Sequence, residues 1–150
     1  MRCCIVTASC LFCVMAVPVP GDAGKAGKEV QGAWHAVELQ TSGRPAPQQV
    51  LEKTRLEIKG DRMTWQSGGA AARKSRIRLD PTRSPKQIDI TALDGPSKGK
   101  TFPGIYSLEK GRLRLCYSHT EERPKEFKTE VGQLRELVIL EREEPHSGRR

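Results

Sequence analysis

The chain has 150 residues, with 26 Lys and Arg against 18 Asp and Glu, and a formal net charge of +8. A chain of this length can form one domain that buries roughly two-thirds of its unfolded surface, and it is too short for two such cores. The basic residues are scattered among Glu and Asp along the chain. This pattern favours an ordinary soluble basic surface over a dedicated anion-binding segment.

The N-terminus has the pattern of a secretory signal. Arg2 precedes an uncharged apolar run over residues 3–19, which is short for a transmembrane helix of about 20 apolar residues. Gly21-Asp22-Ala23 follows and offers small residues, Gly21 and Ala23, at the two positions that a signal peptidase reads. We therefore expect a signal peptide over residues 1–23, cleaved after Ala23, and a periplasmic or extracellular mature protein without a transmembrane segment.

The cysteines support removal of this segment. Cleavage after Ala16 or Ala26 is an alternative, but every choice leaves Cys116 as the single cysteine of the mature chain, so no internal disulfide can form. Lipoprotein anchoring is disfavoured, because Phe12 stands where a lipidated Cys13 would need a small residue. The cysteines removed with the signal are Cys3, Cys4, Cys10 and Cys13.

The mature chain alternates short apolar–polar stretches with turns. A flexible Gly- and Lys-rich linker is expected over residues 24–29, and one helical turn near residues 48–53, with Pro47 suited to its first position. Phe127 is a candidate start for a short edge strand. Strands are expected at residues 30–39, 54–59, 62–66, 74–79, 87–91, 101–108, 112–117 and 134–140.

The turns decide how these strands pair. Gly60-Asp61 is a two-residue connection and Glu109-Lys110-Gly111 a three-residue one, and strands joined by such turns must be antiparallel. About eight strands with one apolar face each form a sandwich or a barrel, and the meander order favours closure, which removes exposed edges. We predict an all-β domain over residues 30–142, an eight-stranded antiparallel up-and-down barrel, followed by a polar tail over residues 143–150.

A glycine two residues before a tryptophan opens the first strand. This Gly32-x-Trp34 pair resembles the structural signature of lipocalin-like barrels, and the resemblance implies that the tryptophan packs across the closed end of the barrel. Ala33 departs from the pattern, in which Thr is common at this position, and the departure affects packing. A lone Gly-x-Trp is a weak signal.

A longer ordered pattern strengthens this interpretation. Residues 30–140 resemble a bacterial family of lipocalin-like domains of unknown function that is found in exported proteins. The resemblance implies a lipocalin-like fold, but that family has no established activity to carry over, and a fold alone does not define a ligand. The matching stretches are 30–34, 58–62, 79–81, 86–90, 94–96, 98–100, 104–108, 111–117, Arg123-Pro124 and Phe127.

The aromatic residues are candidates for a ligand site. An eight-stranded barrel is just wide enough to be filled by its own side chains or to hold one small molecule, and the sequence leaves both alternatives open. The hypothesis is a carrier that buries the apolar part of a small hydrophobic or amphipathic molecule, with a Tyr hydroxyl or an Arg holding its polar end. The candidate ligand-binding residues are Trp65, Phe102, Tyr106 and Tyr117.

Two basic stripes offer an alternative function. If they lay on nearby strands, they could form a basic face for an anionic component of the cell envelope, and the protein would be a non-enzymatic interaction module. On opposite sides of the barrel they would be only a solvated exterior. No nucleic-acid recognition motif is present. The stripes consist of Lys74, Arg76 and Arg78 in one strand and Arg112 and Arg114 in another.

Nothing in the sequence marks a catalytic or metal site. His35, His119 and His146 have no second ligand at the spacing that zinc sites require. Cys116 and His119 could be a nucleophile and its base, but a nucleophile also needs an orienting group and an oxyanion site. We therefore expect no enzyme activity, no metal and no cofactor.

Overall fold

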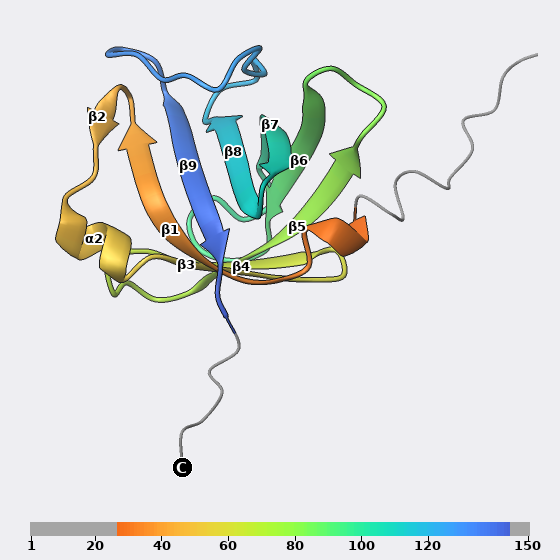
Figure 1. Ribbon diagram of the computed structural model, residues 1–150. Coiled ribbons are helices and arrows are strands. Elements are labelled where there is room, and N and C mark those ends of the chain that lie inside the picture. Colours follow the sequence, from red (N-terminus) through yellow and green to blue (C-terminus); the bar gives the residue numbers. More distant parts are fainter. Residues whose placement is uncertain (1–26, 145–150) are drawn as a thin grey trace, which may run out of the picture.

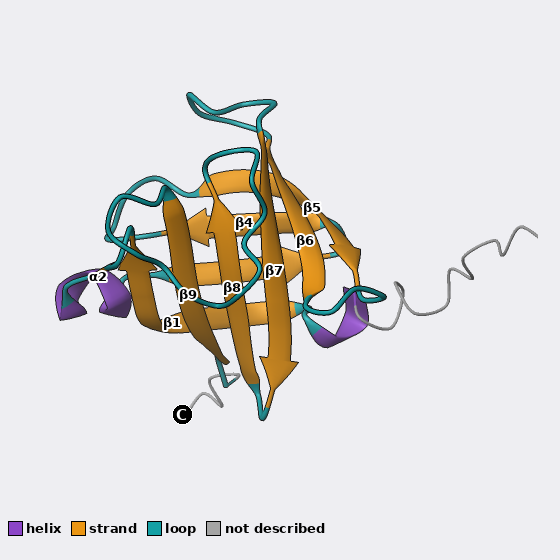
Figure 2. Cartoon of the chain, turned by 90° about the horizontal axis from the view of Figure 1, so that it is seen from above, coloured by secondary structure: helices purple, strands orange, loops and turns teal. Residues whose placement is uncertain are grey.

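The computed structural model describes residues 27–144, which form a closed β-barrel (Figure 1). The predicted signal peptide, residues 24–26 of the predicted linker and residues 145–150 of the tail lie outside the described residues. One short helix, α2 (Gln48–Glu52), lies on the outside of the barrel beside β1 (Figure 2). The strands are β1 (Gly32–Thr41), β2 (Arg44–Pro45), β3 (Arg55–Lys59), β4 (Arg62–Gln66), β5 (Arg73–Asp80), β6 (Lys86–Ala92), β7 (Thr101–Glu109), β8 (Arg112–Ser118) and β9 (Arg135–Arg142).

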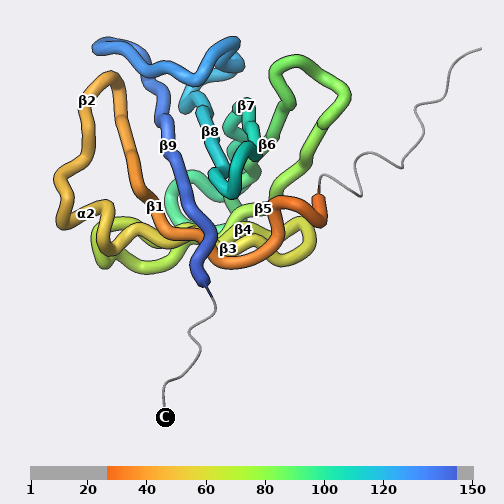
Figure 3. Tube along the Cα trace, viewed as in Figure 1, coloured from red at the N-terminus to blue at the C-terminus, as the bar shows by residue number. Residues whose placement is uncertain are grey.

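Eight of the strands close the barrel and every pairing is antiparallel. Strands β3 to β9 pair in chain order, and β9 returns to pair with β1, from Trp34 opposite Arg142 to Thr41 opposite Glu136. Figure 3 shows β9 running beside β1. The two-residue β2 adds a short ribbon to the end of β1. The predicted all-β, eight-stranded antiparallel barrel is confirmed.

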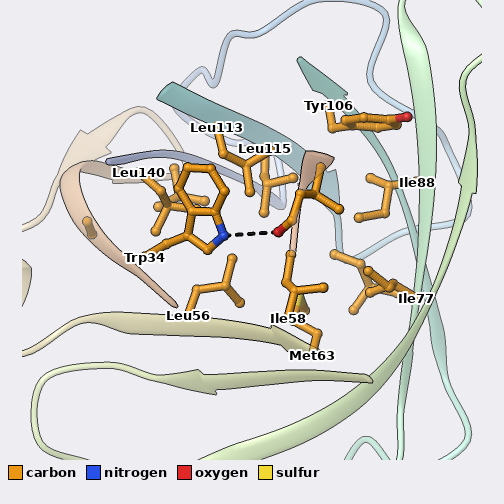
Figure 4. Close-up of a cluster of buried hydrophobic side chains, with 14 of the residues drawn as sticks. Trp34, Leu56, Ile58, Met63, Ile77, Ile88, Tyr106, Leu113, Leu115 and Leu140 are labelled. Carbon is orange, nitrogen blue, oxygen red and sulfur yellow. Dashed lines mark hydrogen bonds between the residues drawn. The ribbon is translucent and has the colours of Figure 1, made fainter. Parts of the chain in front are cut away.

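The first strand starts two residues later than predicted. Residues 27–29, which the sequence placed in a flexible linker, form a helical turn, and the Val30 side chain is only 2% exposed. Trp34 explains this arrangement, because its Nε1 donates a hydrogen bond of 3.0 Å to the Val30 carbonyl (Figure 4). Gly32, at a φ of 116°, turns the chain from the helical turn into β1.

The main core fills the end of the barrel that contains Trp34, which we call the Trp34 end. The Trp34 ring is fully buried against inward-facing aliphatic side chains such as Leu56, Leu113 and Leu140. The Arg142 guanidinium lies 4.2 Å from the ring centroid and donates 2.5 Å to the Gln31 carbonyl. A cation over an indole face is stabilised by the cation–π interaction. Arg142 of β9 therefore connects this strand to β1 through Trp34 and to the N-terminal turn through Gln31.

The long connection between β8 and β9 is fastened to the outside of the barrel. Figure 1 shows it crossing above the ends of these strands. Arg123 donates hydrogen bonds to the carbonyls of Ile88, at 3.0 Å, and Gly104, at 2.6 Å, and pairs with the Asp89 carboxylate at 2.5 Å. Gly104 on β7 also lies close to the backbone of β8. A Cβ at this position would lie 2.8 Å from the Cys116 carbonyl oxygen, so the approach of the two strands here requires glycine.

Phe127 belongs to this connection and forms no strand, contrary to the prediction. It packs on a second, smaller core on the outer face, formed by Ile105, Cys116 and Leu137. Side chains alternate across a strand, so these outward residues would be exposed without the covering loop. The stretches 104–108 and 111–117, with Arg123-Pro124 and Phe127, therefore form one structural unit.

The other end of the barrel carries the longer connections, and we call it the long-loop end. The Trp34 end has tight turns at residues 60–61 and 110–111, whereas the long-loop end has the connections 67–72, 93–100 and 119–134. Longer loops leave room for an opening between strands.

Candidate functional site: a cavity at the long-loop end

A cavity of about 370 Å³ opens at the long-loop end. The ends of β4, β5, β6, β7, β8 and β9 and residues of the three long connections surround it. Its apolar lining includes Met63, Trp65, Ile90, Phe102 and Leu115, and its polar lining includes Arg73, Ser75, Asp94, Tyr117, His119 and Glu136.

Small side chains explain why the barrel is hollow here. Ser75 on β5 lies directly opposite Ala92 on β6, and both face inward. One step deeper, the same two strands place Ile77 opposite Ile90, which are buried in the core. A barrel of this width is filled only by large side chains. The Ile77–Ile90 pair therefore fills the interior at its depth, whereas the Ser75–Ala92 pair, nearer the long-loop end, leaves space. We call this pair the Ser–Ala layer.

Three of the four predicted ligand residues line the cavity: Trp65, Phe102 and Tyr117. Tyr106 does not. It lies four residues beyond Phe102 on β7, roughly 13 Å deeper toward the Trp34 end, and is only 2% exposed. Burial, reinforced by Glu29 and Asp80, raises the pKa of Tyr106 to about 12. Tyr106 was a candidate because of its aromatic ring, and the residue type carries no information on depth within the barrel.

A polar cluster stands on the β8–β9 side of the cavity. The Tyr117 hydroxyl donates a short hydrogen bond to Glu136 Oε2, and His119 Nε2 lies 2.9 Å from Glu136 Oε1. The Glu136 side chain is 21% exposed and the His119 side chain 39% exposed. The strand register brings them together, because Tyr117 lies opposite Glu136 across the β8–β9 pair.

The cluster fixes the protonation of its members. Burial opposes ionisation of Glu136, but hydrogen bonds from His119 and Tyr117 outweigh it, and the pKa of Glu136 is lowered. Burial, and next the Glu136 charge, raise the pKa of Tyr117 well above its ordinary value, so the phenol remains a donor. The hydrogen bond to Glu136 raises the pKa of His119. An ionised carboxylate therefore stands inside a largely apolar cavity.

Aromatic rings surround this carboxylate. The Phe102 and His119 ring centroids are 5.2 Å apart in an edge-to-face arrangement, and Tyr117 lies 5.6 Å from His119 and 6.5 Å from Phe102. These spacings are those of packed aromatic pairs. The result is an aromatic wall with one anionic group.

The sequence prediction missed Glu136 and His119. Glu136 lies two residues before Val138 and four before Leu140, so strand alternation places it on the same inward face as these buried residues, and this signal could have found it. His119 continues the inward row of Leu113, Leu115 and Tyr117 by one more step beyond β8. The prediction included Glu136 in the strand 134–140 without assigning it a role, and it considered His119 only as a metal ligand or as a base for Cys116.

The two basic stripes lie on separated strands. They point outward on β5 and β8, with β6 and β7 between them. Arg112 pairs with Glu141 at 2.7 Å, and the Arg114 guanidinium lies 4.5 Å from the Phe127 ring centroid, partly covered by the β8–β9 connection. The stripes therefore do not meet in one basic face. They comprise Lys74, Arg76 and Arg78 on β5, and Arg112 and Arg114 on β8.

Cys116 and His119 are not a nucleophile–base pair. Cys116 faces the outer core, is fully buried, and its Sγ contacts the Lys128 carbonyl at 3.8 Å, whereas His119 faces the cavity. Burial raises the pKa of the Cys116 thiol, which disfavours the reactive thiolate. Within residues 27–144, no group of three or more His, Cys, Asp or Glu side chains could hold a metal ion. No helix in that range is long and apolar enough to span a bilayer.

Comparisons with known proteins found no family model, curated protein or solved structure that matches this chain. The resemblance to exported lipocalin-like domains therefore stays a prediction that rests on the sequence pattern.

Proposed function

We propose that this chain is an exported, lipocalin-like carrier that binds a small amphipathic molecule in the cavity at the long-loop end. The observation that carries the proposal is the cavity itself. Its volume of about 370 Å³ falls within the roughly 300–1,000 Å³ range of small-molecule sites, and its composition, apolar with a few converging polar groups, is typical of them.

The lining determines how a ligand would lie. Met63, Ile90 and Leu115 form the deep part of the cavity, where an apolar chain or ring would be removed from water. Burial of apolar surface contributes about 25 cal/mol per Å². The polar groups lie nearer the opening, so the polar end of the ligand would face the long loops.

Native mass spectrometry tests whether a ligand is present. Mature protein is recovered from the extracytoplasmic fraction of its own host, which also tests the predicted export. We expect an added mass that disappears on denaturation and that identifies the class of ligand. Failure to find the protein in this fraction contradicts export, independently of binding.

A cavity-filling variant tests whether the cavity is the site. Ala92→Phe places a large ring in the Ser–Ala layer, whereas Thr91→Phe places the same ring on the outer face of the same strand. We expect Ala92→Phe to abolish uptake of an apolar fluorescent probe and Thr91→Phe to retain it, with both variants showing wild-type circular dichroism. Equal uptake by all three proteins would place binding elsewhere and contradict the proposal.

A further inference from the structure

Glu136 is the one acidic side chain that β9 directs into the barrel. It shares the inward face of this strand with Val138 and Leu140, which are buried in the core, while Glu141 points outward and pairs with Arg112. An ionised carboxylate that is only 21% exposed at an apolar cavity has lost much of its hydration. Its presence there needs compensation by positive charge or by donated hydrogen bonds.

The protein supplies only part of that compensation. Among the described residues, Glu136 receives two hydrogen bonds, one from Tyr117 and one from His119. A carboxylate has about four acceptor sites, so acceptor capacity remains on the side that faces the cavity. The phenol of Tyr117 is uncharged, and His119 is neutral whenever the pH exceeds its pKa. The cluster then carries a net charge of −1.

The surrounding rings add to the attraction for a cation. Phe102, Tyr117 and Trp65 all line the same cavity as Glu136. Aromatic faces attract ammonium groups, and the attraction is stronger when the cation is desolvated. A carboxylate within an aromatic wall is a combination that selects cationic groups over anionic ones.

The opposite wall carries the competing charge. Arg73 and Lys74 on β5 both line the cavity four strands away from Glu136, and the Asp94 carboxylate of the β6–β7 loop, which also lines it, accepts a hydrogen bond from the Lys74 backbone N–H. Arg73 and Lys74 are both exposed at the rim, where water and salt weaken their electrostatic field. The interaction of a charged ligand head with the less exposed Glu136 is screened less, so Glu136 determines whether the cavity prefers a cationic or an anionic head.

We propose that the ligand of this cavity is a cationic amphipath, whose ammonium-type head binds Glu136 between the aromatic rings while its apolar part fills the space below. The inference rests on the proposed function, and it names the chemical class of the ligand.

The test compares three probes that share one decyl chain and differ in the head: decyltrimethylammonium, decyl sulfate and an uncharged decyl glycol ether. Each is titrated into the mature protein below its critical micelle concentration, at a pH above the His119 transition. Trp65 is in the cavity, so its fluorescence reports binding, and calorimetry gives the dissociation constants. We expect the ammonium probe to bind about tenfold or more tightly than the sulfate. Its quaternary ammonium has no N–H to donate, but it is attracted by the Glu136 charge and by the aromatic faces, whereas the sulfate is repelled by the carboxylate.

Two variants identify the responsible charge. Glu136→Gln keeps an acceptor for Tyr117 but removes the negative charge, and Glu141→Gln removes a charge from the outer face of the same strand. We expect the ammonium preference to disappear in the first variant and to remain in the second, with binding of the uncharged probe unchanged in both.

The outcomes separate this inference from the proposed function. Binding of the uncharged probe without any ammonium preference, or a preference that survives in Glu136→Gln, overturns the inference and leaves the carrier function standing. Failure of all three probes to bind overturns both.

Discussion

The two ends of the barrel differ in what fills them and in how they are closed. At the Trp34 end, large side chains occupy the whole interior, the turns are tight, and Arg142 covers the indole of Trp34. At the long-loop end, Ser75 and Ala92 leave a cavity and an ionised carboxylate faces inward. One set of strands thus supports stability at one end and leaves a cavity at the other.

The largest expected effect comes from truncating the two tryptophans, one at each end. Trp34→Ala removes a fully buried ring and its hydrogen bond, and we expect it to lower the free energy of unfolding by about 3–5 kcal/mol. Trp65→Ala removes a partly exposed ring from the cavity, and we expect a loss of about 1 kcal/mol together with weaker ligand binding. Urea denaturation measures both, and similar losses in the two variants would contradict the division of roles.

The next effect concerns the connection that covers the outer core. Arg123→Met leaves two carbonyls and the Asp89 carboxylate without their donor, and we expect a loss of about 2 kcal/mol. The control is Arg83→Met, which removes an exposed guanidinium that pairs with Asp80 in a surface turn and should change stability by about 0.5 kcal/mol at most. An Arg123→Met variant as stable as this control would show that the connection is not fastened by these bonds.

The sequence predicted the features of the barrel that depend on local order in the chain, but not those that depend on contacts between distant strands. Strand alternation and tight turns predicted the barrel, because these features depend only on neighbours in the chain. The aromatic residue type made Trp65, Phe102 and Tyr117 candidates for its interior. The cavity depends on which side chains meet across strands. Ser75 lies opposite Ala92, and Tyr117 opposite Glu136, only in the register that the complete barrel enforces. The outer core could not be predicted either, because it depends on hydrogen bonds from Arg123 to carbonyls that are distant in the sequence.

A smaller effect distinguishes the two tyrosines of the barrel. The Tyr106 hydroxyl is buried without a hydrogen-bond partner among the described residues, so Tyr106→Phe should leave stability unchanged or raise it by up to about 1 kcal/mol. Tyr117→Phe removes a donor from Glu136, and we expect a loss of about 1 kcal/mol and altered binding in the cavity. Thermal unfolding of both variants beside the wild type measures the contrast. It would be contradicted if Tyr106→Phe were the more destabilising change.

The smallest effect is the pH dependence of the Glu136–His119 pair. The pKa of His119 is raised in the folded protein, so its contribution is complete below the ordinary imidazole pKa of 6.5 and is lost as the pH rises through the raised value. The pKa of Glu136 is lowered from 4.5, so its contribution is complete above that value and is lost as the pH falls through the lowered one. Both contributions are therefore complete between about pH 4.5 and 6.5.

Because His119 is partly exposed, solvent screening limits this contribution to a few tenths of a kcal/mol. We expect the stability difference between wild type and His119→Gln to be larger near about pH 5.5 than near about pH 8.5. Protonation of His119 has the opposite effect on ligand affinity, since a protonated His119 neutralises the carboxylate that a cationic head would bind. Affinity for the ammonium probe, whose own charge does not titrate, should therefore rise as His119 loses its proton, and a flat profile in the wild type would separate His119 from the binding site.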